Sequence, residues 1–239
     1  MDILNGAVVH AVRGDRKQYK PIKSVLCQTA DPLDVALAFR KLGFAEVYMA
    51  DLDAIIRNEP NLAIINQIVK TTGLRIMVDA GVTDLPRAEQ LLANQVSKVV
   101  IGTETLRRIS FVAGAVRSLG GNRVVVSLDL KNGRLLGEFD FGKFPEPLDL
   151  LREFQKMGVK QVIVLDLARV GSGEGIDVPF LKKVCEELDF EFFVGGGVRD
   201  LPDLIEMNSL GISGVLLATA LHSGRITVDK LKRAGFSLG

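Results

Sequence analysis

The stretch VDAGVTDLP at residues 78–86 returns as VGGGVRDLP at residues 194–202, about half of the 239-residue chain further on. Six of the nine positions are identical in the two copies. The positions that differ are Asp79, Ala80 and Thr83, which become Gly195, Gly196 and Arg199. A repeat at this spacing indicates that the chain is built from two similar halves.

Three further pairs of segments recur in the same order. VYMADLDAI (47–55) resembles VIVLDLARV (162–170), KVVIGTETL (98–106) resembles GVLLATALH (214–222), and DILNG (2–6) resembles DLKNG (129–133). The repeat therefore extends over successive structural units and is not confined to one turn. Such a duplication favours a fold made of two equivalent halves.

Short apolar runs rich in β-branched residues alternate with segments of helical period along the whole chain. Continuous apolar character is typical of parallel strands that are buried on both faces. Several helical segments begin with Asp, Asn or Thr, carry Pro in the first turn and end at Gly, as capped helices do. Seven strands are predicted, at residues 46–50, 74–78, 98–101, 123–128, 161–165, 191–194 and 214–218, with eight helices between and after them.

These observations predict an α/β fold, a (βα)₈ TIM barrel formed as a single domain from half-barrels at about residues 1–117 and 118–239. The barrel needs an eighth strand at the front, which has to end in MDIL at residues 1–4. We therefore expect either an unusually short first strand or a few residues upstream of Met1 that this numbering lacks. A doubly wound open sheet shows the same alternation, but it gives no reason for the repeat.

The composition limits the partners of the chain. Thirty Lys and Arg side chains against 29 Asp and Glu give a net charge near zero, which favours neither nucleic acid nor an anionic membrane. Cys27 and Cys185, like His10 and His222, show no metal-ligand spacing, and we expect neither a disulfide nor a structural metal. Because no apolar run reaches the length of a membrane span and no signal peptide is evident, we expect a cytoplasmic protein.

The active site of a parallel α/β barrel lies at the carboxyl ends of its strands. Glycines that lead from a strand into a helix let backbone N–H groups approach a phosphate, although they can also serve only to make tight turns. Two such cradles would hold a substrate with a phosphate at each end. The candidate binding residues are Gly81, Gly102 and Thr103 in the first half, and Gly196, Gly197, Ala218 and Thr219 in the second.

Carboxylates also follow the predicted strands. Asp2 and Asp129 fall at equivalent, opposed strand ends, where two carboxylates can divide into a general base and a general acid. Asp166 is a candidate for substrate binding and Asp51 a further one, but aspartates after strands often only hold loops through backbone N–H groups.

Two basic features are further candidates. The loop RGDRKQYKPIKS (13–24), which includes Lys20, is either a solvated charged face or a lid that brings cations to a substrate phosphate. Arg199 either reaches a phosphate or a carboxylate, or pairs with Asp200 or Asp203 on the surface.

Together these segments, with VSLDLKNGRLL (126–136), resemble the histidine-biosynthesis barrel family, specifically its ProFAR isomerases and, less closely, the cyclase subunit of imidazole glycerol phosphate synthase. The resemblance implies an Amadori rearrangement, the aldose-to-ketose isomerisation of an aminosugar, on a bisphosphorylated substrate without cofactor or metal. It also implies that Asp2 acts as general base and Asp129 as general acid.

The chain departs from this family at positions that contact substrate. Leu165 stands in place of a threonine, Asp79 and Ala80 replace glycines, and residues 218–220 read Ala-Thr-Ala instead of Gly-Arg-Ala. Asp79 is a candidate site residue because it places a carboxylate where a phosphate is expected. Two other hypotheses therefore stay open: a cyclase-like or lyase-like enzyme for another phosphorylated metabolite, and a non-catalytic phosphometabolite-binding protein. The oligomeric state is not constrained.

Overall fold

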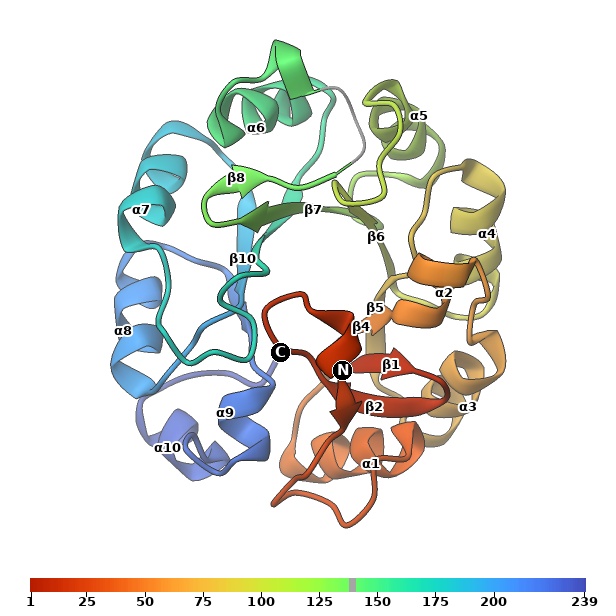
Figure 1. The fold of residues 1–239 in the computed structure, drawn as a ribbon, viewed down its shortest axis with the longest axis vertical. Coiled ribbons are helices and arrows are strands. Elements are labelled where there is room, and N and C mark those ends of the chain that lie inside the picture. The colour runs from red at the N-terminus through yellow and green to blue at the C-terminus, as the bar shows by residue number, and fades with distance from the viewer. Residues whose placement is uncertain (138–140) are drawn as a thin grey trace.

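The structure, a computed structural model, describes residues 1–137 and 141–239, and its helices surround a sheet that curls into a barrel (Figure 1). It confirms the TIM barrel built from two similar halves. The boundary predicted between the halves falls in the last turn of α5. The wall of the barrel consists of β1 (Asp2–Leu4), β4 (Glu46–Asp51), β5 (Arg75–Asp79), β6 (Lys98–Gly102), β7 (Val124–Lys131), β9 (Gln161–Asp166), β10 (Glu191–Gly195) and β11 (Gly214–Leu216).

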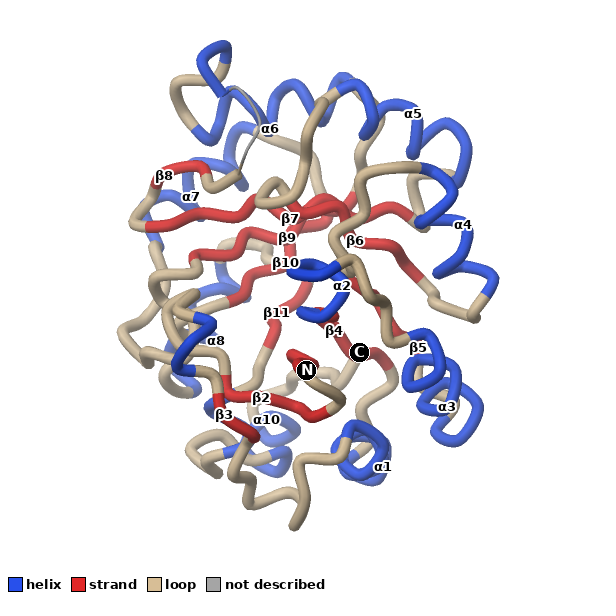
Figure 2. Tube along the Cα trace, turned by 45° about the vertical axis from the view of Figure 1, so that its right-hand side comes forward, coloured by secondary structure: helices blue, strands red, loops and turns tan. Residues whose placement is uncertain are grey.

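Helices cover the outside of this wall, as Figure 2 shows from a second direction. They are α1 (Pro32–Leu42), α3 (Leu62–Thr72), α4 (Leu85–Ala93), α5 (Ser110–Leu119), α6 (Pro147–Lys156), α7 (Val178–Glu187), α8 (Leu201–Ser209) and α10 (Val228–Arg233). The sequence did not predict the short helices α2 (Leu52–Arg57) and α9 (Thr219–His222), nor the single-turn 3₁₀ helices at Arg16–Gln18 and Phe141–Lys143.

Neighbouring wall strands pair in parallel from β1 through β4, β5, β6, β7, β9 and β10 to β11. The first strand is short and pairs with β4 through Asp2 opposite Ala50 and Ile3 opposite Asp51. No strand pairing among the described residues joins β11 to β1, so the seam of the barrel lies between them. Three short strands that the sequence did not predict are antiparallel additions: β2 (Ala7–His10) and β3 (Lys20–Pro21) extend β1, and β8 (Arg134–Leu135) pairs with β7.

The wall strands are buried on both faces because their side chains alternate between two cores. On β7, Val124 and Val126 belong to the large core between sheet and helices, whereas Val125 points into the barrel. Inside the barrel, Val125 packs with Met77, Val100 and Ile163. This explains why the strands read as continuous apolar runs.

Helix ends follow the predicted capping chemistry. The Asp31 side chain accepts hydrogen bonds from the N–H groups of Leu33 and Asp34, Pro32 stands in the first turn, and α1 ends at Gly43 with φ of 100°. These caps define where the helix begins and ends.

No helix in the described part of the chain combines the length and the apolar character needed to cross a membrane.

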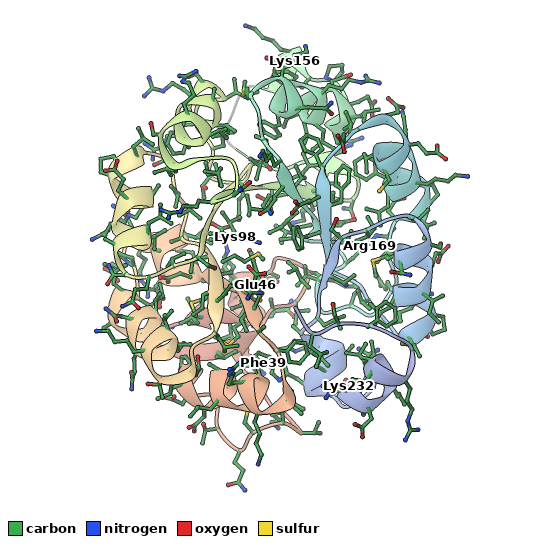
Figure 3. All side chains as sticks on the ribbon, turned by 180° about the vertical axis from the view of Figure 1, so that it is seen from behind. Phe39, Glu46, Lys98, Lys156, Arg169 and Lys232 are labelled. Atoms are coloured by element: carbon green, nitrogen blue, oxygen red, sulfur yellow. The ribbon has the colours of Figure 1, made fainter. Side chains whose placement is uncertain are left out.

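The amino ends of the strands carry a charged pair of their own. Lys98 Nζ lies 3.2 Å from Glu46 Oε1 and 5.5 Å from the centre of the Phe193 ring. Figure 3, which views the barrel from behind, shows Lys98 and Glu46 near its centre. The carboxyl ends, at the opposite side of the barrel, hold the carboxylates described next.

Candidate active site

A cavity of about 830 Å³ occupies the barrel and its mouth. Three aspartates line it from three different strands: Asp2 on β1, Asp79 on β5 and Asp129 on β7. The structure thus brings the expected pair, Asp2 and Asp129, to one cavity and adds Asp79 to it.

Asp129 is held by a dense set of hydrogen bonds. Its side chain is 3% exposed, and Ser127 Oγ donates to Oδ1 over 2.6 Å while the Glu104 N–H donates to Oδ2 over 2.9 Å. The Thr103 hydroxyl accepts from the Asp129 N–H over 2.9 Å and lies 3.5 Å from Oδ2. Burial raises the pKa of the Asp129 carboxyl to about 6, although these hydrogen bonds favour its charged form.

Asp79 carries a second perturbed carboxyl. Its Oδ1 accepts a hydrogen bond from the Gly81 N–H over 3.0 Å, and the side chain is 8% exposed. Burial, followed by the negative charge of Asp129, raises the pKa of Asp79 to about 8. A carboxyl with this pKa is mostly protonated at neutral pH.

Gly102 allows these two carboxylates to approach each other. A Cβ atom at this position would lie 2.9 Å from Asp129 Oδ2 and 3.1 Å from Asp79 Oδ2. Real Cβ atoms do not tolerate the first of these contacts, so a side chain here would displace a carboxylate.

Asp2 faces the same cavity from the first strand. Burial raises the pKa of its carboxyl above the ordinary value, and the positive charges of the Met1 ammonium and His10 act in the opposite direction. Tyr48 on β4 lines the cavity between these groups, and its own pKa is raised by burial and then by Asp79, Asp2 and Asp129.

The basic loop lies across the mouth of the barrel. Arg16 Nη2 contacts both carboxylate oxygens of Glu104, at 2.6 and 2.8 Å, and both residues line the cavity together with Tyr19. The Arg13 N–H donates to the Val170 carbonyl over 2.9 Å, which ties the loop to the segment after β9. The loop is thus attached to both halves of the barrel.

A neighbouring cavity of about 370 Å³ contains the second predicted anion cradle. Gly196, Gly197, Ala218 and Thr219 line it, together with Lys20 and Lys23 from the loop. Within the described residues, the N–H groups of Gly196, Gly197 and Thr219 donate no hydrogen bond. These free donors and the two lysines give the cavity the chemistry of an anion site.

The first predicted cradle is different. Gly81, Gly102 and Thr103 stand at the expected strand ends, but the Gly81 N–H donates to Asp79 and the Thr103 N–H to the Ser127 carbonyl over 2.9 Å. Glu104, next along the chain, gives its N–H to Asp129. The prediction that this turn offers free N–H donors to a phosphate does not match the geometry, because internal acceptors take those donors.

Three other candidates have structural partners. Asp51 caps α2 and accepts hydrogen bonds from the Asn61 N–H and side chain, both over 2.7 Å. Asp166 accepts from the Ala168 N–H over 3.0 Å and pairs with Arg169 over 3.2 Å, while it lines a separate surface cavity. Arg199 pairs with the buried Asp203 over 2.6 Å, one of the alternatives left open above.

Sequence reasoning missed Ser127, Tyr48 and Glu104. The spacing of two between Ser127 and Asp129 carries a signal, since residues two apart on a strand point to the same face. Glu104 had no such signal, because its partner Arg16 is 88 positions away. Leu165, the position of the expected threonine, lines the main cavity and would contact any Cβ added at Gly195.

Comparison with known proteins adds an independent finding. A sequence model of the family described as "Histidine biosynthesis protein" matches residues 1–227. An uncharacterised protein of Methanocaldococcus jannaschii is 32% identical over 97% of this chain and 95% of its own length. Two relatives are named 1-(5-phosphoribosyl)-5-((5-phosphoribosylamino)methylideneamino)imidazole-4-carboxamide isomerase. The one from Syntrophus aciditrophicus is 30% identical over 96% of this chain and 94% of its own length, and the one from Streptococcus sanguinis is 29% identical over 98% and 96%.

Proposed function

The chain belongs to the histidine biosynthesis protein family and is an enzyme of the isomerase type, and from this premise we propose that it isomerises a phosphorylated aminosugar. The proposed reaction is the aldose-to-ketose rearrangement that the named relatives suggest. The observation that carries the proposal is that Asp2 and Asp129 line one buried cavity, next to a cradle of free N–H donors.

The rearrangement moves the oxidation level of the carbonyl or imine carbon from C1 to C2 of the sugar. One proton leaves C2 and one proton arrives at C1, and no electrons leave the substrate. A general base and a general acid are therefore sufficient for the reaction. We propose Asp2 as the base at C2 and Asp129 as the acid that protonates the ring oxygen when the sugar opens.

The surroundings of Asp129 support its role. A pKa of about 6 lies close to neutral pH, where a carboxyl can both release and recover a proton during turnover. The hydrogen bonds from Ser127 and from the Glu104 N–H fix the orientation of the carboxyl before substrate binds. The phosphate would lie at Gly196, Gly197 and Thr219, with Lys20 above it.

The test is loss of the C2 proton and incorporation of solvent deuterium at C1. Phosphorylated aldosylamines are incubated in D₂O, and both positions are followed by NMR. We expect deuterium incorporation with the unchanged protein and a loss of about a hundredfold or more for Asp129→Asn, in the range for removal of a general acid. The exposed Asp189→Asn is the matched control and should keep full activity.

Phosphate binding separates chemistry from folding. Asp129→Asn should bind inorganic phosphate as the unchanged protein does, because the cradle lies on β10 and β11 and not on β7. Exchange that survives in Asp129→Asn would contradict the assignment. Ligand binding without any exchange would instead indicate a non-catalytic binding protein.

A further inference from the structure

The region around the ends of β5 and β6 is the part of the mouth that the proposed phosphate cradle does not explain. Asp79, Asp129 and Glu104 all line the main cavity here. The nearest guanidinium, that of Arg16, already contacts both oxygens of Glu104. This end of the cavity therefore carries more carboxylates than cations.

A phosphate would find no support at this end. The N–H groups of Gly81, Thr103 and Glu104 are all engaged with internal acceptors. A phosphate dianion would also face the negative charge of Asp129 and would oppose the ionisation of Asp79, because like charges in a buried site repel strongly. The equivalent turn in the other half has free N–H groups and lysines.

Asp79 has binding capacity that the protein itself does not use. Its Oδ1 accepts the Gly81 N–H, but within the described residues Oδ2 has no hydrogen-bond partner. The side chain is more than nine-tenths buried and belongs to the cavity lining. Because this side chain lines the cavity and no described protein group donates to Oδ2, that oxygen can take a hydrogen bond from a ligand group.

We propose that Asp79 selects the substrate: the enzyme takes a sugar with a single phosphate, held at Gly196, Gly197 and Thr219, whose other end carries an amine that binds Asp79 Oδ2. The inference rests on the proposed function for the identity of the sugar, but not for the position of either binding group. An ammonium is the complement of this end of the cavity, because it donates hydrogen bonds and offsets the excess of carboxylates.

The protonation of Asp79 fits this role. Burial and Asp129 raise the pKa of Asp79 to about 8, so its carboxyl is mostly protonated at neutral pH. An ammonium would favour the charged carboxylate and release that proton. A bisphosphorylated sugar would have the opposite effect and would bind poorly.

The experiment measures affinity by calorimetry near neutral pH with two matched ligand pairs. Glucosamine 6-phosphate against glucose 6-phosphate tests the amine, and fructose 1,6-bisphosphate against fructose 6-phosphate tests the second phosphate. The unchanged protein should prefer the amine by about tenfold, as expected for a charged hydrogen bond. It should not bind the bisphosphate more tightly than the monophosphate.

Two variants of Asp79 and one of the cradle complete the design. Asp79→Asn should lose the amine preference, and Asp79→Gly, which places the residue of the second repeat here, should gain affinity for the bisphosphate. Lys20→Met, which removes one of the two lysines that line the cradle, should weaken every phosphate ligand alike and leave the amine preference intact. Circular dichroism confirms that each variant is folded.

The proposal is overturned if the unchanged protein shows no amine preference, if it binds the bisphosphate about tenfold more tightly, or if the preference survives in Asp79→Asn. All of these are binding measurements. Failure of the isomerase proposal appears instead as absent deuterium exchange, so the two failures are distinguishable.

Discussion

After the end of β10, Gly196 and Gly197 leave free N–H groups beside a cavity that lysines border. At the equivalent end of β5, Asp79, Ala80 and Gly81 use the glycine N–H internally and place a protonated carboxyl beside Asp129. The two turns share their sequence frame and their place in the barrel. The two halves kept the same scaffold after the duplication. The substitutions changed the charge of the ligand group that each strand end can bind.

The glycines of the second turn also have a packing role. A Cβ at Gly197 would lie 2.2 Å from the Gly175 carbonyl oxygen, and one at Gly196 would lie 2.8 Å from the Asp166 carbonyl oxygen. The segment after β9 therefore rests directly on this turn, and the Gly175 N–H donates to the Gly197 carbonyl over 2.9 Å. One short stretch thus both shapes the cradle and supports a loop.

The largest expected effect is a pH dependence of the free energy of unfolding, which arises from Asp79 in the first half. A carboxyl whose folded pKa is raised binds a proton that the unfolded chain has released, so its stabilising effect is lost as pH rises. For Asp79, the loss runs from its ordinary value of 3.8 to about 8, at up to about 1.4 kcal/mol per pH unit. Urea unfolding between pH 5 and 8 should show this fall, and Asp79→Asn should flatten it. Equal slopes in both proteins would contradict the account.

The next effect concerns the second turn. Gly197→Ala forces a Cβ against a backbone oxygen at a residue with φ of 86°, and we expect a loss of about 3 kcal/mol in the free energy of unfolding. Gly81→Ala is the matched variant, with φ of 61° and a Cβ 3.1 Å from Ile55 Cα, and should cost about 1 kcal/mol. Denaturant titration measures the loss in the free energy of unfolding for both variants. A larger loss for Gly81→Ala than for Gly197→Ala would contradict the prediction.

A third prediction concerns the contact between the carboxylates. Gly102→Ala should displace Asp129 or Asp79 and lower turnover about a hundredfold, since misplacement by an ångström has effects of this size. Gly114→Ala in α5 is the control, because a Cβ there meets nothing within 4 Å. Deuterium incorporation at C1 of the product measures the turnover of both variants. Full activity in Gly102→Ala would show that the carboxylates need not be so close.

The smallest effect is expected at the loop. Arg16→Ala removes a partly exposed pair with Glu104 and should cost about 1 kcal/mol or less in stability. Because the charge of Arg16 lowers the pKa of Asp79, its removal should raise that pKa further. Carbon NMR of the Asp79 carboxyl measures this pKa. An unchanged pKa would show that the charge of Arg16 does not act on Asp79.

The sequence was sufficient for the strands of the barrel wall, most of the helices and the positions of the two opposed aspartates. Continuous apolar runs locate strands buried on both faces, and the residue after each run falls at the mouth by geometry alone. The repeat also placed Asp79 opposite Gly195, which pointed to a changed site. These signals are local or periodic, and so they can be read along the chain.

What the sequence did not provide depends on partners from distant elements. From the sequence, Asp51 could either line the cavity or cap α2. The choice depends on Asn61, which the fold brings next to Asp51 and which donates hydrogen bonds to it. The pairing of Arg16 with Glu104 joins the first loop to the end of β6, and Arg199 had two equally reasonable carboxylates nearby. Such choices follow from three-dimensional packing, which local sequence does not encode.

The central claim is that the turn after β10 binds phosphate and the turn after β5 does not. Counting the anions in a crystal soaked with phosphate tests this claim most directly. The account predicts one phosphate, on the N–H groups of Gly196, Gly197 and Thr219, and none beside Asp79. A second phosphate bound at Gly81 and Thr103 would contradict it.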